Sequence, residues 1–157
     1  MIKINKILYP TDFSEYSKAA LPYAISLSKQ NNAELYCLHV VEMPQEEYLS
    51  GEYMLPLNAS HVSEDQILKT SGARLDKFVK ENMSEITKVI SKALIGTPFV
   101  EIIHYAKEQS IDLIVMGTHG HSALAAMLLG SVAEKVVRKA PCPVLTVRHP
   151  LHKFEMP

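Results

Sequence analysis

The chain has 157 residues, a length typical of one domain, and its 47% hydrophobic and 21% charged residues argue against global disorder. Its formal net charge of −1 gives no electrostatic basis for binding nucleic acid or an anionic membrane. No apolar run approaches the length of a membrane span, and the first residues lack the apolar core of a signal peptide. Cys37 and Cys142 form no CxxC pair, so we expect reduced thiols and a cytoplasmic location.

The first part of the chain predicts two strands separated by one helix. Residues 4–9 and 34–41 are apolar strand patterns, and the second is apolar enough to be buried on both faces. Between them, Ser14 can cap a helix that extends over residues 14–30. Pro22 lies inside this helical pattern, and we expect a kink there because the apolar period resumes beyond it.

The periodicity fails between residues 42 and 62, where prolines, a glycine and acidic residues separate tyrosines and leucines. A connection of this length tends to be functional, and we expect it to act as a lid over a ligand or a partner. The rest of the chain returns to regular patterns. It predicts a helix from Ser63, a strand within 86–95, a helix from Thr97, a strand at 112–116, a helix at 132–139 and a strand at 143–148.

Strands and helices therefore alternate along the whole chain. This order predicts an α/β fold with a doubly wound parallel sheet, formed by one domain over residues 1–148 and followed by a poorly ordered tail at 149–157. In such sheets ligands bind at the carboxyl ends of the strands, where the strand order reverses. If the first and fourth strands are neighbours, Asp12 and Gly117 face each other across one crevice.

The stretch from Gly117 to Ser131 is the main candidate for a binding site. Its spacing is G-x2-G-x9-G-S, it follows an apolar strand, and it leads into a helix. Glycines let backbone N–H groups approach an anion closely, and a helix N-terminus adds unpaired donors. Ser131 and Glu134 also fit a capping box, which places the helix start next to Gly130. The stretch is neither a P-loop nor G-x-G-x-x-G, and on these residues alone a plain strand–loop–helix connection fits equally well.

Two other kinds of site receive less support from the residues. His119 and His121 form an H-x-H pair without a third ligand nearby, so we do not expect a zinc site held by protein ligands alone. Asp12, Ser14 and His39 are the residue types of a catalytic triad, but no nucleophile-elbow sequence accompanies them. We interpret His39 as a hydrogen-bonded core residue.

Several segments together resemble the universal stress proteins over residues 3 to 148. They are residues 7–14, 38–40, 114–120, 130–131 and 143–145. The glycine spacing is the mark of the ATP-binding branch of that family. The resemblance implies a five-stranded sheet in the order 3-2-1-4-5, of the Rossmann-like type found in adenine-nucleotide α-hydrolases, with the nucleotide between the first and fourth strands.

The resemblance also implies which residues contact an adenine nucleotide, namely ATP with or without Mg²⁺. The matching positions are Pro10, Thr11, Asp12, Val40, Met116, Gly117, His119, Gly120, His121, Gly130, Ser131 and Val132. The Val40 backbone would read the base edge, and the glycine stretch would line the phosphates. His121 stands where relatives often have a basic residue, so the phosphate affinity depends on the charge of an imidazole.

Three classes of function follow from these patterns. The first is an ATP-binding regulatory protein in the stress response, with slow or no hydrolysis. The second is an ATP-hydrolysing or nucleotidyl-transfer enzyme, although the chain has no dedicated catalytic base and no S-G-G-x-D-S motif. The third is a nucleotide-free dimeric interaction module, against which the intact glycines argue. The first class is our prediction, with no residue assigned a catalytic role.

The two outer strands of the expected sheet differ in the charged residues that would prevent them from pairing with a strand of another chain. The third strand carries Lys88 and Lys92, whereas the last strand, Val144-Leu145-Thr146-Val147, has no charge before Arg148. An undefended edge of this kind predicts a homodimer through the last strand. The family resemblance implies the same arrangement.

Overall fold

The computed structural model describes residues 1–43, 63–121 and 129–150. Its elements, in chain order, are β1 (Lys6–Pro10), α1 (Glu15–Lys18), α2 (Leu21–Asn31), β2 (Glu34–Val41), α3 (Glu64–Asn82), β3 (Val89–Ile95), α4 (Pro98–Glu108), β4 (Leu113–Gly117), α5 (Ser131–Lys139) and β5 (Val144–Val147). The lid predicted at 42–62 and the tail predicted at 149–157 lie outside the described residues, except for positions 42, 43, 149 and 150.

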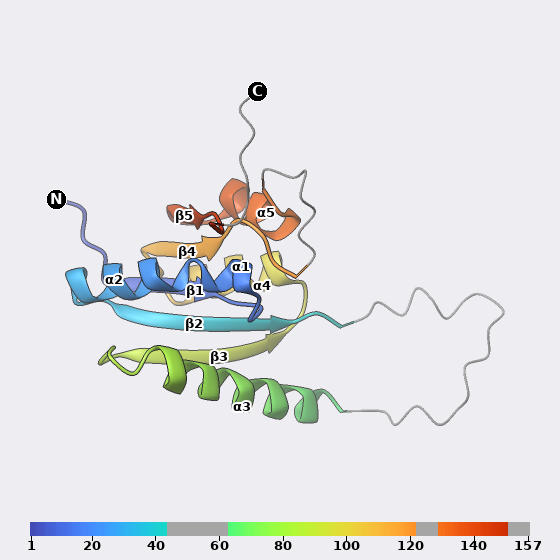
Figure 1. The fold of residues 1–157 in the computed structure, drawn as a ribbon. Coiled ribbons are helices and arrows are strands. Elements are labelled where there is room, and N and C mark those ends of the chain that lie inside the picture. The colour runs from blue at the N-terminus through green and yellow to red at the C-terminus, as the bar shows by residue number, and fades with distance from the viewer. Residues whose placement is uncertain (44–62, 122–128, 151–157) are drawn as a thin grey trace, which may run out of the picture.

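The five strands form one parallel sheet in the order β3-β2-β1-β4-β5 (Figure 1). This order and the flanking helices confirm the predicted doubly wound α/β fold. In Figure 1, α3 runs beside β3 at one edge of the sheet, and α5 lies beside β5 at the other. Among the helices of the described residues, none is long and apolar enough to cross a membrane.

Side chains of the central strands alternate between two hydrophobic clusters, one on each face of the sheet. On β1, Ile7 and Tyr9 belong to the cluster beneath α2 and α3, whereas Leu8 belongs to the cluster beneath α4 and α5. All three side chains have no exposed surface. Because helices cover both faces, residues 35–38 of β2 are buried on both faces, within the range of 34–41 for which the sequence pattern predicted this burial.

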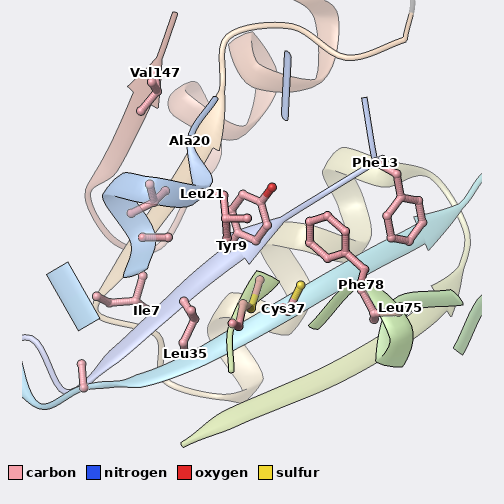
Figure 2. Close-up of a cluster of buried hydrophobic side chains, with 14 residues drawn as sticks. Ile7, Tyr9, Phe13, Ala20, Leu21, Leu35, Cys37, Leu75, Phe78 and Val147 are labelled. Carbon is pink, nitrogen blue, oxygen red and sulfur yellow. The ribbon is translucent and has the colours of Figure 1, made fainter. Parts of the chain in front are cut away.

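The first of these clusters extends to the carboxyl end of β1 through a set of aromatic rings (Figure 2). Phe13 and Phe78 meet edge to face with ring centroids 5.5 Å apart, and Tyr9 lies between them and Leu21 in the view of Figure 2. The Tyr9 hydroxyl donates a hydrogen bond to the Ser17 carbonyl at 3.1 Å. The chain segment after β1 is therefore held by packing as well as by hydrogen bonds.

The strand β1 separates from β4 near its carboxyl end. Their parallel ladder pairs Ile7 with Leu113 and Leu8 with Ile114, although β1 continues to Pro10 and β4 to Gly117. On its other side β1 stays paired with β2 as far as Pro10. The sheet thus opens between β1 and β4, at the point where the strand order reverses.

Two local predictions were wrong. The single helix expected over residues 14–30 is divided into α1 and α2, and Pro22 lies in the first turn of α2. A proline has no N–H for the Lys18 carbonyl and fits best where that donor is not needed, so a new helix begins instead of a kink forming. The capping box at Ser131 and Glu134 does not form, because Gly130 is the N-cap and Ser131 is the first helical residue.

We expect the replacement Ile114→Ala to lower the free energy of unfolding by about 2–5 kcal/mol, because it removes a fully buried side chain from the central part of the sheet. Ile90→Ala on the edge strand β3 is the matched control, since Ile90 is 38% exposed. Denaturant unfolding of the two variants measures the difference. Equal losses would contradict the arrangement of strands described here.

Candidate functional site

A cavity of about 660 Å³ lies at the carboxyl ends of β1, β2 and β4. All twelve residues that the sequence singled out line it. Their proximity follows from the parallel sheet, which brings the carboxyl ends of neighbouring strands to the same edge. The cavity has the size and the mixture of apolar and polar side chains that small-molecule sites have.

The turn after β1 carries Asp12 and is held in a strained conformation. Phe13 has a φ angle of 64°, in the left-handed region that few non-glycine residues adopt. Its N–H donates to the Thr11 hydroxyl oxygen at 3.0 Å, and its ring lies against the ring of His39 with centroids 4.4 Å apart. Such strain persists only where surrounding contacts hold it, and it is frequent at binding sites.

The Asp12 carboxylate lies across the opening between β1 and β4. Its Oδ1 accepts hydrogen bonds from the Ser14 backbone N–H at 3.0 Å and from the Ser14 hydroxyl at 2.5 Å. Its Oδ2 accepts from the backbone N–H of His121 at 2.8 Å. Burial acts to raise the pKa of Asp12, but these hydrogen bonds outweigh it and hold the pKa below the usual value. The carboxylate is therefore ionised near neutral pH.

The side chain of His121 makes a second contact with Asp12. Its Nε2 lies 2.6 Å from the backbone oxygen of Asp12. Because a carbonyl oxygen only accepts, Nε2 carries the proton in this contact. These two hydrogen bonds connect the chain after β1 with the chain after β4, and no sequence pattern predicted them.

Glycine is required at two positions of the stretch for different reasons. A Cβ atom on Gly120 would lie 2.4 Å from Oδ2 of Asp12, so the carboxylate occupies the space beside this glycine. A Cβ atom on Gly117 would lie 2.5 Å from the backbone oxygen of Tyr16. Gly117 therefore allows α1 to pack against β4, which is a structural role in addition to the predicted one.

The helix α5 begins at the wall of the cavity. The Gly130 N–H donates to the Thr118 carbonyl at 2.7 Å, which brings the helix start back to the end of β4. The first helical bond runs from the Glu134 N–H to the Gly130 carbonyl at 2.9 Å. The N–H groups of residues 131–133 therefore have no partner within the helix, and these three residues line the cavity. This is the arrangement in which helix N-termini bind anions.

The two predicted imidazoles of the glycine stretch face different partners. His119 is 6% exposed, and its Nδ1 lies 3.0 Å from the Thr118 hydroxyl oxygen. His121 is turned to Asp12, as described above. Within residues 1–43, 63–121 and 129–150, no group of three or more His, Cys, Asp or Glu residues could hold a metal ion.

The end of β2 forms another part of the cavity. Val40 lines the cavity, and so does His39, whose Nδ1 lies 2.8 Å from the Thr11 carbonyl oxygen. Burial lowers the pKa of His39 despite the opposing effect of this hydrogen bond. The sequence interpretation of His39 as a hydrogen-bonded core residue omitted its position at the cavity.

Sequence reasoning also missed lining residues that come from helices. Pro98 and Ile102 of α4 and Arg74 of α3 line the cavity. The sequence indicated only that one helix begins at Thr97 and another at Ser63, and in the second of these Arg74 precedes the buried residue Leu75. No motif marks these residues, because the sheet brings them to the site only after folding.

The chain matches a family model described as the universal stress protein family over residues 3–148. It is 40% identical to universal stress protein MJ0531 of Methanocaldococcus jannaschii over 147 residues, which cover 93% of this chain and 83% of that protein.

Solved structures show the same fold. That of protein MJ0577, also from Methanocaldococcus jannaschii, has a TM-score of 0.76 at 29% identity and covers 96% of this chain and 99% of its own. A universal stress protein in complex with cAMP has a TM-score of 0.67 at 23% identity, covering 93% of this chain and 98% of its own, a likeness of fold alone. The match to the family model, the identity to the relative and the shared fold agree, and the chain belongs to the universal stress protein family.

Proposed function

We propose that this protein binds an adenine nucleotide, with ATP as the principal ligand, and acts as a regulatory protein in the stress response. The observation that carries the proposal is the position of the first turn of α5. Its first three residues, whose backbone N–H groups have no partner within the helix, line the same cavity as Asp12 and Val40. One end of the cavity therefore suits phosphate, and the other end offers backbone and apolar groups to a base.

The orientation of the nucleotide follows from these two ends. The phosphates lie against the residues of the glycine stretch and the start of α5, where backbone donors gather. The base lies toward the carboxyl end of β2, between the Val40 backbone and the apolar side chains of Pro98 and Ile102. The complex of a family member with cAMP supports a nucleotide as the class of ligand, because cAMP contains the same base and ribose.

A Mg²⁺ ion would be held by the phosphates and water rather than by a group of protein ligands. Slow or absent hydrolysis fits the environment of Asp12. Both of its carboxylate oxygens already accept hydrogen bonds, and its lowered pKa makes it a weak base. We place the protein in the cytoplasm, and we assign it no nucleic-acid or membrane partner.

ATP and ADP should raise the melting temperature of the parent protein, because a ligand that binds the folded state stabilises it. Gly120→Val should abolish most of this increase, since a branched side chain would enter the cavity beside Asp12. Gly72→Val is the matched control, because Gly72 lies in α3 and a Cβ atom there meets nothing within 4 Å. Differential scanning fluorimetry provides the measurement. An equal ATP-dependent increase in Gly120→Val and the parent would overturn the phosphate assignment.

Hydrolysis of ATP should proceed well below about 10 s⁻¹, the median turnover of enzymes. The physical reason is that both carboxylate oxygens of Asp12 already accept hydrogen bonds and its pKa is lowered, so it is a poor base for activating water. Release of phosphate under saturating Mg²⁺ and ATP measures the rate. Rapid turnover that disappears in Asp12→Asn would instead support the alternative function as an ATPase.

We further propose that the protein is a homodimer through β5. In the described sheet β5 pairs only with β4, so its outer edge is unpaired. Leu145 is 37% exposed on this strand, and Val137 of α5 is 48% exposed. Val147, in contrast, is buried in the cluster on the α2 face and serves the core of the subunit. Antiparallel pairing of two such edges about a two-fold axis closes the assembly.

Replacing Leu145 with Lys should shift the protein from dimer to monomer, because it places a charge on the strand edge that the two copies share. Ile90→Lys on the opposite edge of the sheet is the control, since Ile90 is exposed to a similar extent at 38%. Multi-angle light scattering at micromolar concentration measures the mass. A monomeric parent, or a Leu145→Lys variant that stays dimeric, would refute this interface.

A further inference from the structure

Arg74 is a charged residue at the cavity that the nucleotide orientation proposed above leaves without a role. It lies on α3, is exposed to solvent, and lines the cavity. Its guanidinium carbon lies 4.2 Å from the centroid of the Phe13 ring. A guanidinium held over an aromatic face is restrained, while its N–H groups remain available at the edge.

No carboxylate of the described residues neutralises Arg74. The ion pairs among these residues involve other cations. Two acidic residues, Asp12 and Glu42, also line the cavity, but neither forms an ion pair with Arg74. Asp12 directs its oxygens to Ser14 and His121 instead. Arg74 is also the one Lys or Arg among the described lining residues, so it is the single permanent positive side-chain charge there.

Arg74 and the start of α5 lie on opposite sides of β1. The helix α3 packs against β3 and β2, whereas α5 packs against β5 and α4 (Figure 1). In the sheet order β3-β2-β1-β4-β5, the strands β2 and β4 flank β1, so they lie about 10 Å apart. The cavity therefore has two positions that attract anions, one made of backbone donors and one made of a guanidinium.

The second position suits a phosphate better than it suits the base. The adenine edge presents an amino donor beside its N7 acceptor, and an amino group opposes the donors of a guanidinium. A phosphate, in contrast, accepts two parallel hydrogen bonds from arginine. The apolar wall of Pro98 and Ile102 comes from α4, on the face of the sheet opposite α3. With the base against that wall, the part of the nucleotide on the Arg74 side of the cavity is the ribose.

We propose that the cavity also binds a nucleoside bisphosphate and prefers it to the nucleoside monophosphate, with its 5′-phosphate at the start of α5 and a 2′- or 3′-phosphate on the ribose at Arg74. This inference rests on the proposed nucleotide-binding function and adds a class of ligand to it. Arg74 is then a specificity-determining residue that contacts the second phosphate. It distinguishes nucleotides by where their charge lies rather than by how much charge they carry.

Isothermal titration of the parent with AMP, ADP and the 2′,5′- and 3′,5′-bisphosphates of adenosine tests this proposal at fixed ionic strength. At least one bisphosphate should bind about tenfold more tightly than AMP, as expected for hydrogen bonds to a charged group. Arg74→Gln should remove this preference, and Arg74→Lys should retain part of it. ADP is the matched ligand, because it also carries two phosphates but holds both at the 5′ end, so its affinity should be the same in Arg74→Gln and the parent.

Lys77→Gln is the matched protein control, because Lys77 carries the same charge on the same helix and is not among the cavity lining. It should bind every nucleotide like the parent. The inference is overturned if neither bisphosphate exceeds AMP in the parent, if the preference survives Arg74→Gln, or if that variant loses ADP and bisphosphate equally. Failure of all four nucleotides to bind the parent would instead refute the proposed function, so the two failures are distinguishable.

Discussion

The hydrogen bonds between Asp12 and His121 are the contacts on which the geometry of the site depends. The paired register between β1 and β4 ends at Leu8 and Ile114, before either strand ends. The two contacts of His121 with Asp12 restore a connection at the mouth of the cavity. They also fix the direction of an ionised carboxylate next to the space that a phosphate would enter. These contacts thus hold β1 and β4 at a fixed separation while the cavity between their carboxyl ends stays open to a ligand.

This arrangement makes the carboxylate and a phosphate competitors for the same region. The Asp12 oxygen lies where a Cβ atom on Gly120 would stand, so a ligand oxygen beside that glycine would meet a negative charge. Like charges at such a distance repel strongly in a partly buried site. A nucleotide bound as proposed would therefore be coupled to the position of Asp12 and, through the turn at Phe13, to the aromatic rings that pack beneath it. That coupling would give the proposed regulatory role a physical route in this chain.

Much of the architecture could be predicted from the sequence, because strictly alternating patterns and fully apolar strands leave few other folds. The residues of the candidate site were also predictable as a group, since the resemblance placed Val40 and Gly130 at the ends of known elements. The break between α1 and α2 was not predictable from periodicity, because the apolar stripe continues across it. The position of Arg74 at the cavity could not be predicted for a related reason. The sequence around a surface arginine in a helix does not indicate which residues of other elements lie next to it after folding.

The hydrogen bond between Gly130 and Thr118 has a consequence for how this chain tolerates insertions. It joins the two ends of the chain that leaves β4 and returns to α5, at a distance of 2.7 Å. The two ends of this connection are thus held together by their own contact, and for a chain segment closed in this way a doubling of length costs only about 0.6 kcal/mol. An insertion after Gly120 should therefore leave the start of α5 in place against the end of β4.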